Sequence, residues 1–410
     1  MISREEILKT AKEQGLAPNV VEKDYVLGWL LAGIAQHPLL SGWVFKGGTC
    51  LKKCFFETYR FSEDLDFTVP KGISYSIDAY RGALVECAER ISSEIGIELP
   101  ESGIEIKESH DKEERITFVG KISYRGPLMP QINTPPRIRI DLTQHEVIVE
   151  SPEKRPIRHF YSDAPDPPFS ILCYTVNEVL AEKTRALLER QARARDVYDV
   201  VNISRNHRDE IDPKQASKIL RKKFEFKELS VPSSEELISS IDFATLEANW
   251  DQQLRHQLPV LPPVQSYFNE LKESALAWME ERPVVERLPL VSVQAGDRAV
   301  PRMAFPQMAQ ARFGSVPPSG GVAFVSNSVL DKIRYAARNR LYVEIQYHGV
   351  SRIVEPYSLR IRGTGNLLLY VHEVLRGGVR TEMTKAYMVA QIQEVKITEK
   401  EFHPRYAVEL

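Results

Sequence analysis

Two glycines followed at a fixed distance by two acids constrain this chain more than any other feature of its sequence. The glycines stand in the run Phe45-Lys46-Gly47-Gly48-Thr49-Cys50, and Asp64 and Asp66 follow, with Asp64 sixteen positions after Gly48. On a β-strand, residues i and i+2 point to the same side. We therefore expect the two carboxylates to share one face of a strand, while the apolar side chains that alternate with them pack into a core.

The chemistry of these residues indicates a site for a metal ion and phosphate. Two carboxylates on one face repel each other unless a cation lies between them, and Mg²⁺ prefers oxygen ligands together with substrate phosphate. Glycines let a backbone approach a ligand closely, and the N–H groups of a turn that leads into a helix bind anions. Such a helix is predicted over residues 49–59. Alone, the glycines fit a plain turn and the acids fit a solvated strand end. Their order and spacing, with Ser62 and Glu63 just ahead of the acids, favour the site.

A lysine lies on the apolar face of a later predicted helix. The apolar stripe of this helix follows the i, i+3, i+4, i+7 rule and consists of Val176, Val179, Leu180 and Leu187. Lys183 falls on the same stripe, so we expect it to face inward. Its ammonium group then either escapes to water while the stem packs, or neutralises triphosphate charge in a cleft.

Two further acids each have a structural and a functional interpretation. Asp141 ends an alternating strand over residues 137–142 and shares a face with two arginines. That pattern fits either a surface ion pair of small energy or a third metal-binding carboxylate. Asp196 is either the N-cap of a helix that begins at Val197 or a contact in the active site. The residues alone leave both choices open.

The composition is that of a soluble globular protein of two or three domains. Hydrophobic residues make up 43% of the chain, charged residues 27%, and the net charge is −2. So small a charge excludes bulk electrostatic adhesion to nucleic acid, and any RNA contact must come from local patches. The sequence shows no leading signal segment and no apolar run long enough to span a bilayer. We therefore expect a cytoplasmic protein without membrane contact.

The cysteines indicate packing rather than metal binding. The four of them, Cys50, Cys54, Cys87 and Cys173, form no C-x-x-C pair and have no histidine at zinc spacing. We expect them to be reduced and buried, and to act as small hydrophobic side chains.

The segment FKGGTCLKKCFFETYRFSEDLDF, residues 45–67, resembles the first motif of the AbiEii/AbiGii-type nucleotidyltransferase toxins. These toxins are a branch of the polymerase-beta-like nucleotidyltransferase superfamily. Further segments resemble, in the expected order, the family's leading helix, its strand with a third acid, and its third and fourth motifs: residues 21–27, 139–142, 177–186 and 195–200. The resemblance extends over residues 1–230.

The resemblance implies an enzyme that moves a nucleoside monophosphate from an NTP to an acceptor such as tRNA. It also implies a toxin or phage-defence role, held in check by a cognate antitoxin. The implied ligands of Mg²⁺ are Asp64, Asp66 and Asp141, and Lys183 and Asp196 complete the implied catalytic set. The implied substrate-binding residues are Lys46, Gly47, Gly48, Thr49 and Ser62. Transfer to a protein or a small molecule, or a non-catalytic nucleotide-sensing regulator, remain alternatives.

The pattern of helices and strands predicts an α+β chain in several parts. Residues 1–165 are expected to form a nucleotidyltransferase core with a small mixed sheet. Residues 166–281 are expected to form a helical domain, helical from Ile171 onward, that completes the active-site cleft. Its basic helix over 214–227 fits either a solvated face or an RNA-contacting patch. Residues 282–323 are predicted to be a linker. Residues 324–410 resemble a WYL domain, which implies a small Sm-like β-barrel and a nucleotide or nucleic-acid ligand.

Overall fold

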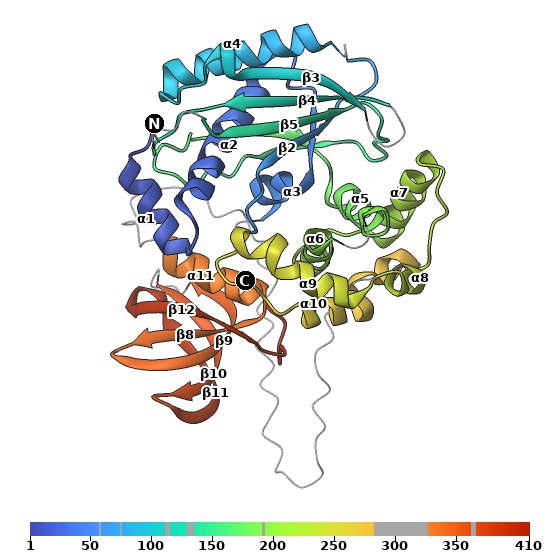
Figure 1. Ribbon diagram of the computed structural model, residues 1–410. Helices are drawn as coiled ribbons and strands as arrows, with labels where there is room; N and C mark the ends of the chain where they lie inside the picture. Colours follow the sequence, from blue (N-terminus) through green and yellow to red (C-terminus); the bar gives the residue numbers. More distant parts are fainter. Residues whose placement is uncertain are drawn as a thin grey trace.

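The computed structural model describes residues 1–56, 59–73, 76–110, 115–128, 135–190, 193–282, 327–361 and 366–410. Figure 1 shows two β-sheets with helices between them. The larger sheet has seven strands and comes from the N-terminal half of the chain, and the smaller has five and comes from the C-terminal end. Among the described residues, no helix combines the length and the apolar character that crossing a membrane requires.

Three helices of the N-terminal half frame the larger sheet. α1 (Arg4–Gln14) begins at the capping residue that the sequence suggests, because the Ser3 hydroxyl accepts a hydrogen bond from the Glu6 N–H. α2 (Pro18–Gln36) is buried along most of its length. α4 (Ile77–Ile95) packs against α2 and against the edge of the sheet, so the two helices cover one of its faces.

The larger sheet is mixed, as predicted, and its strand order is β3-β4-β5-β2-β1-β7-β6. β2 pairs antiparallel with β1 and parallel with β5, which places the acid-bearing strand at the centre. The strands are β1 (Val44–Lys46), β2 (Asp64–Thr68), β3 (Ile104–His110), β4 (Ile116–Ser123), β5 (Arg137–Thr143), β6 (Glu153–Pro156) and β7 (Ser170–Cys173).

The glycine turn between β1 and β2 is part of a helix. α3 (Gly47–Cys50) begins at the first glycine and continues into a π-helical turn, Leu51–Phe55. The helix predicted over residues 49–59 therefore starts earlier and ends sooner than expected. The helix ends at Phe55 because the next residue, Phe56, has extended backbone angles of φ −107° and ψ 137°.

A layer of helices follows the larger sheet. The prediction that the chain is helical from Ile171 onward is wrong at its start, because β7 pairs with β1 there and the first helix begins at Val176. A strand of four residues, Ser170–Cys173, is too short for periodicity to separate it from a helix. The helices are α5 (Val176–Glu189), α6 (Ala194–Asn206), α7 (Pro213–Phe226), α8 (Ser234–Ser239), α9 (Phe243–Leu254) and α10 (Val264–Glu270).

The C-terminal part begins with α11 (Asn327–Arg338) and continues as an antiparallel sheet of order β11-β10-β9-β8-β12. β11 and β12 are its two edges, so the described residues form an open sheet and not the predicted closed barrel. Its strands are β8 (Leu341–Tyr347), β9 (Val350–Ile361), β10 (Leu367–Arg376), β11 (Val379–Met388) and β12 (Ile392–Glu401). The predicted linker, apart from Arg282, lies outside the described residues.

The C-terminal part packs closely on the helical layer. The Asn339 side-chain oxygen, just after α11, accepts hydrogen bonds from the hydroxyl groups of Tyr267 at 2.6 Å and Tyr198 at 3.3 Å. Tyr335, on α11, donates its hydroxyl hydrogen to the Val260 carbonyl oxygen at 2.5 Å. Because these polar groups are buried, separating the two parts would leave them without partners.

Candidate active site

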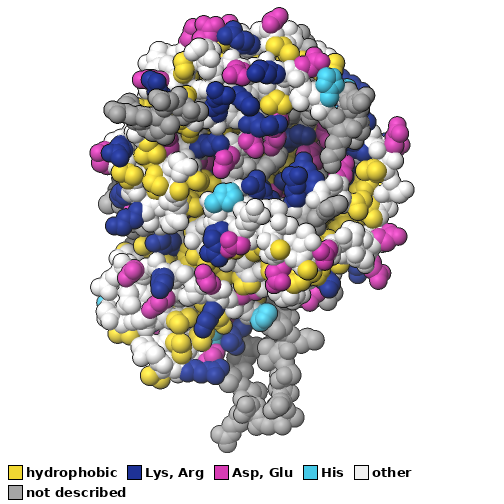
Figure 2. All heavy atoms as spheres, in the orientation of Figure 1, with side chains coloured by type: hydrophobic (Ala, Val, Ile, Leu, Met, Phe, Trp, Pro, Cys, Tyr) yellow, Lys and Arg dark blue, Asp and Glu magenta, His cyan; other side chains and the backbone are white. Residues whose placement is uncertain are grey.

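The strand register brings the predicted acids into one row. Asp66 on β2 lies opposite Lys46 on β1 and beside Asp141 on β5, and the next row pairs Asp64 with Arg139. Asp64 and Asp66 are partly exposed, while the apolar residues that alternate with them on β2 are buried, which confirms the shared face. Figure 2 shows acidic and basic side chains gathered around a hollow between this sheet and helices α5–α7.

Both glycines make room for side chains of the site. Gly47 has φ +79°, and a β-carbon there would lie 2.2 Å from the Asp66 Oδ2 atom. A β-carbon on Gly48 would lie 2.6 Å from an Arg60 guanidinium nitrogen and 3.0 Å from the Ser62 Oγ atom. Any larger residue would therefore displace an acid or an arginine of the site. The sequence predicts close backbone approach here, and the groups that approach are side chains of the protein itself.

Thr49 holds the helix onto the acid strand. Its side chain is fully buried, and its hydroxyl donates a hydrogen bond of 2.5 Å to the Asp64 carbonyl oxygen. The first N–H groups of a helix have no partner within it. Contact between Thr49 and a ligand would therefore go through the backbone, because the hydroxyl is already occupied.

The acids repel one another. Burial raises the pKa of Asp66 to about 6, and the negative charges of Asp141 and Asp64 add to the rise while Lys46 opposes it. Burial and Asp141 also raise the pKa of Asp64, against the attraction of Lys23. A bound cation would reverse these shifts, because it favours the charged form of each carboxylate. The donor set, all carboxylate oxygen, fits a hard divalent ion such as Mg²⁺.

Asp141 is held by an arginine of its own strand. The Arg139 Nε–H donates to both carboxylate oxygens of Asp141, at 2.8 and 3.0 Å. The ion pair between Asp141 and Arg139 is therefore present in the structure. The register also places the Asp141 carboxylate beside Asp66, as a metal-binding role requires.

Lys183 lies inward, as its position on the apolar stripe predicts. Its Nζ atom lies 2.7 Å from Asp199 Oδ2 and 3.2 Å from Asp196 Oδ1, and 12% of its side chain is exposed. Burial works against the charge, but Asp199 and Asp196 outweigh it and raise the pKa of Lys183. The ammonium group is thus held between two carboxylates, and the interpretation in which it escapes to water is wrong.

Asp196 is not a helix cap. α6 begins at Ala194 with Arg193 as its N-cap, so Asp196 lies in the first turn of the helix and the N-cap interpretation is wrong. The residue is 2% exposed. One carboxylate oxygen pairs with Lys183, and Oδ2 is buried without a hydrogen-bond partner. An unpaired buried oxygen beside an ammonium group can accept a hydrogen bond from a substrate.

The acid that anchors Lys183 is not among the site residues predicted from the sequence. Asp199 is fully buried and accepts hydrogen bonds from Arg60 Nε and Nη2, both at 2.7 Å, and from the Tyr59 hydroxyl at 2.6 Å. Burial opposes its charge, but Arg60 and Lys183 hold the pKa of Asp199 far below its usual value. A signal was present, because Asp196 and Asp199 are three apart and share one face of α6.

A second buried lysine lies on α7, in the helix predicted to be a basic surface. Lys223 is fully buried, and its Nζ atom lies 2.7 Å from Glu178 Oε1, 3.6 Å from Glu182 Oε2 and 3.0 Å from the Val147 carbonyl oxygen. This residue can therefore neither be solvated nor contact RNA. Glu182 Oε1 also lies 3.5 Å from the Lys46 Nζ atom, so the cluster reaches the edge of the acid row.

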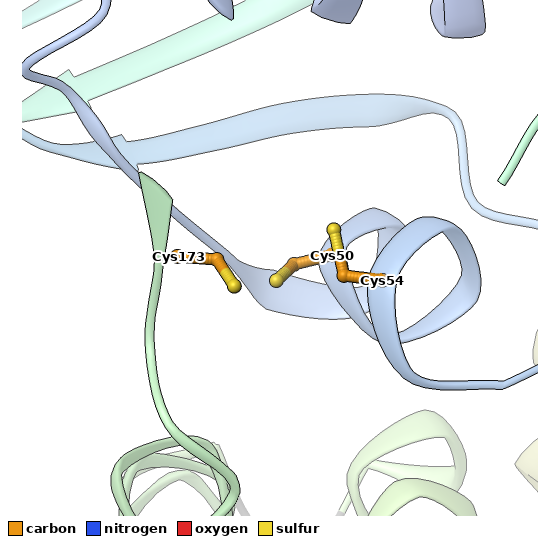
Figure 3. Close-up of side chains that lie close together, drawn as sticks. All are labelled: Cys50, Cys54 and Cys173. Atoms are coloured by element: carbon orange, nitrogen blue, oxygen red, sulfur yellow. The ribbon is translucent and has the colours of Figure 1, made fainter. Parts of the chain in front are cut away.

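Three cysteines come together beneath the glycine turn (Figure 3). Cys50 from α3, Cys54 from the π-helical turn and Cys173 from β7 are free and buried, as predicted, and their sulfur atoms all lie within 4.8 Å of one another. Among the described residues, this trio is the one group of three potential metal ligands so close together, and the three aspartates are more widely spaced. Three thiols could hold a soft cation. No sequence pattern predicts this grouping, because Cys173 is distant along the chain from the other two cysteines.

Comparisons with known proteins identify the family of this chain. A family model described as "Nucleotidyl transferase AbiEii toxin, Type IV TA system" matches residues 29–277. Among solved structures, the chain is similar to MenT4, a nucleotidyltransferase toxin from Mycobacterium tuberculosis H37Rv, with 17% sequence identity and a TM-score of 0.46. That likeness covers 68% of this chain and 90% of MenT4. No match was found among curated proteins.

Proposed function

Since this chain belongs to the AbiEii family of nucleotidyltransferase toxins of type IV toxin–antitoxin systems, we propose that it transfers a nucleoside monophosphate from an NTP to RNA. The observation that carries the proposal is the row formed by Lys46, Asp66 and Asp141, with Gly47 packed against the central acid. Transfer of this kind needs positioning and charge neutralisation more than covalent chemistry from the protein. The row and the buried Lys183 supply both.

Asp64, Asp66 and Asp141 would hold Mg²⁺, which would neutralise the triphosphate and lower the pKa of the attacking hydroxyl group. The backbone N–H groups at Gly48 and Thr49 would face the phosphates.

Lys183 would stabilise the charge that develops on the phosphates, because Asp199 keeps its ammonium group protonated and fixed. The Asp196 Oδ2 atom, which has no hydrogen-bond partner, would accept a hydrogen bond from the substrate. Lys46 and Ser62 flank the row and would complete the NTP site.

An exposed sheet face beside the acids supports an RNA acceptor. The row of Asp64 and Arg139 continues across β4 to Lys121, and the row of Asp66 and Asp141 continues to Lys107 on β3. A cavity of about 230 Å³ lies on this face, and its charged lining consists of Lys107, Lys121 and Arg139 together with Glu105 and Glu108. Basic side chains in line with a metal-binding row suit a phosphate backbone. Because tRNA is such a polyanion, we favour it as the acceptor.

The family also implies a cognate antitoxin, and we place toxin and antitoxin in the cytoplasm, where NTPs and tRNA are available. For the C-terminal part we retain the resemblance to a WYL domain as a proposal. Its sheet is open, so any ligand would bind on a face or edge of the sheet or against α11.

The test is to incubate the protein with each α-³²P-labelled NTP and total RNA, and to identify the labelled molecule. We expect labelled RNA with wild type, none after chelation of divalent metal, and recovery when Mg²⁺ is added back. Asp66→Asn should show no labelling, and Asp78→Asn, an exposed acid on α4, should behave as wild type. Label on a protein or small molecule would favour the alternative acceptors. Failure to label anything with any NTP would refute the proposal.

A further inference from the structure

A cavity of about 340 Å³ lies between α1, the helix after the glycine turn, and the C-terminal part of the chain. α1 lies beside α11 and β12 in Figure 1, and residues of all three elements line the cavity. Neither the acids of the candidate active site nor Lys183 line it. Its volume is within the range of sites that bind small molecules.

The cavity contains a carboxylate oxygen without a hydrogen-bond partner. Asp24 is 6% exposed, and its Oδ2 atom accepts hydrogen bonds from Lys53 at 2.8 Å and from the Tyr161 hydroxyl at 2.9 Å. Its Oδ1 atom is buried and accepts none. Buried polar atoms are rarely left unsatisfied, so this oxygen indicates that a donor arrives with a ligand.

An ammonium group lies beside that oxygen. Lys52 Nζ is 3.9 Å from Asp24 Oδ1, which is too long for a hydrogen bond, and 3.7 Å from the centre of the Phe61 ring. At this point of its wall the cavity thus presents an acceptor and a donor side by side. A ligand that offers a donor next to an acceptor would satisfy both.

The walls of the cavity are rich in aromatic rings. Tyr59, Phe61, Phe160, Tyr161 and Tyr335 line it. Flat ligands with a π-face stack on such rings, and unpaired nucleobases are recognised by stacking together with hydrogen bonds to their edges.

We propose that this cavity binds a nucleobase with a lactam edge, in which a ring N–H lies next to a carbonyl group. The N–H would donate to Asp24 Oδ1, the carbonyl oxygen would accept from Lys52, and the ring would stack on an aromatic wall. Guanine and uracil have this edge. Adenine and the cytosine of a nucleoside do not, because their ring nitrogens at the corresponding edge carry no hydrogen.

The Tyr59 side chain connects the cavity with the candidate active site. The ring of Tyr59 lines it, and the Tyr59 hydroxyl donates to Asp199, which lies 2.7 Å from the Lys183 Nζ atom. A base stacked in the cavity would fix Tyr59 and, through Asp199, the position of Lys183. The C-terminal part supplies Tyr335 to the wall, so the site needs the full chain.

Isothermal titration calorimetry of the full chain with guanosine, uridine, adenosine and cytidine tests the proposal. We expect guanosine or uridine to bind and the other two nucleosides to bind at least tenfold more weakly. Lys52→Met removes a hydrogen bond from a charged group and should weaken binding roughly ten- to hundredfold. Val260→Trp would fill the cavity and should abolish binding, and Lys52→Met keeps the test decisive if this variant fails to fold.

Two controls locate the site. Lys222→Met, an exposed lysine on α7, should bind as wild type, and Asp66→Asn should retain binding because the cavity is separate from the acid row. Four results would overturn the proposal: no binding of any nucleoside, equal binding of all four, unchanged affinity in Lys52→Met, or loss of binding in Asp66→Asn. None of these depends on whether the protein transfers nucleotides.

Discussion

Two inward-facing lysines, Lys183 on α5 and Lys223 on α7, lie among carboxylates, and they differ in how far their side chains are buried. Lys223 is fully buried, and three glutamates and a backbone carbonyl surround its ammonium group. Lys183 keeps 12% of its side chain exposed, and one oxygen of its partner Asp196 has no hydrogen-bond partner. An oxygen without a hydrogen-bond partner does not distinguish a structural lysine from a catalytic one, because Glu182 Oε2 beside Lys223 has none either. The exposed part of the Lys183 side chain does, because it leaves room for a substrate.

The two lysines should also differ in how much their loss destabilises the fold. A buried ion pair contributes little net stability, because desolvation offsets the attraction, but removing one partner leaves an uncompensated charge. We therefore expect the loss of Lys223 to act on the fold and the loss of Lys183 to act mainly on the rate.

The largest expected effect is on stability. Lys223→Met should lower the free energy of unfolding by about 3–5 kcal/mol, because Glu178 would lose its buried cation. Urea unfolding followed by circular dichroism measures the change. Lys222→Met is the matched control, because its side chain is 54% exposed on the same helix, and it should unfold as wild type. A Lys223 variant as stable as this control would show that the cluster is not structural.

Lys183→Met should lower the rate of nucleotide transfer by about 10²–10³-fold, because one preorganised charge is lost. Its stability loss should be smaller than that of Lys223→Met, since Arg60 still pairs with Asp199 through two hydrogen bonds. Single-turnover labelling and urea unfolding of the same preparations separate the two effects. If the rate is unchanged and only stability falls, Lys183 is a second structural lysine and the comparison fails.

The same two lysines show what the sequence could and could not predict. Periodicity placed Lys183 on a buried stripe because α5 has one clear apolar face. Lys223 follows the buried Ala216, Ile219 and Leu220 at the same spacing, so periodicity also places it inward, but its partners are on another helix and a distant loop. The hydrophobic pattern of a segment depends only on residues that are close in sequence. It therefore cannot identify a partner that comes from a distant segment.

The site shows the same limit. Asp64 and Asp66 were predictable because strand alternation fixes their face. Arg60 and Tyr59 were not, because their partner Asp199 is far along the chain. In the C-terminal part Gly377 and Gly378, with φ +56° and +83°, form the turn that joins β10 to β11. A glycine pair between two alternating runs predicts such a hairpin.

Asp66 is a third charged group to set beside the two lysines, and among the described residues no cation is hydrogen-bonded to it. Asp66 has its pKa raised from 3.8 to about 6 by burial and its acidic neighbours, so ionising it costs stability above pH 6. With divalent metal absent, Asp66→Asn should raise the free energy of unfolding at pH 8 by up to about 3 kcal/mol. The gain should shrink as the pH falls from 6 towards 4, because the wild-type carboxyl group is then neutral too. Urea unfolding at several pH values measures it, and a variant less stable than wild type at pH 8 would contradict the repulsion.

The smallest effect should come from the residue that connects the Lys223 cluster to the acid row. Glu182 lies 3.6 Å from the Lys223 Nζ atom and 3.5 Å from the Lys46 Nζ atom, distances too long for strong hydrogen bonds. Glu182→Gln should therefore change the free energy of unfolding by about 1 kcal/mol or less, in the range of weak ion pairs. The transfer rate should also change far less than in Lys183→Met, because Glu182 would act on the substrate only through Lys46. If Glu182→Gln destabilises the protein as much as Lys223→Met does, or slows transfer as much as Lys183→Met does, then the two lysine clusters behave as one network and the distinction between them is wrong.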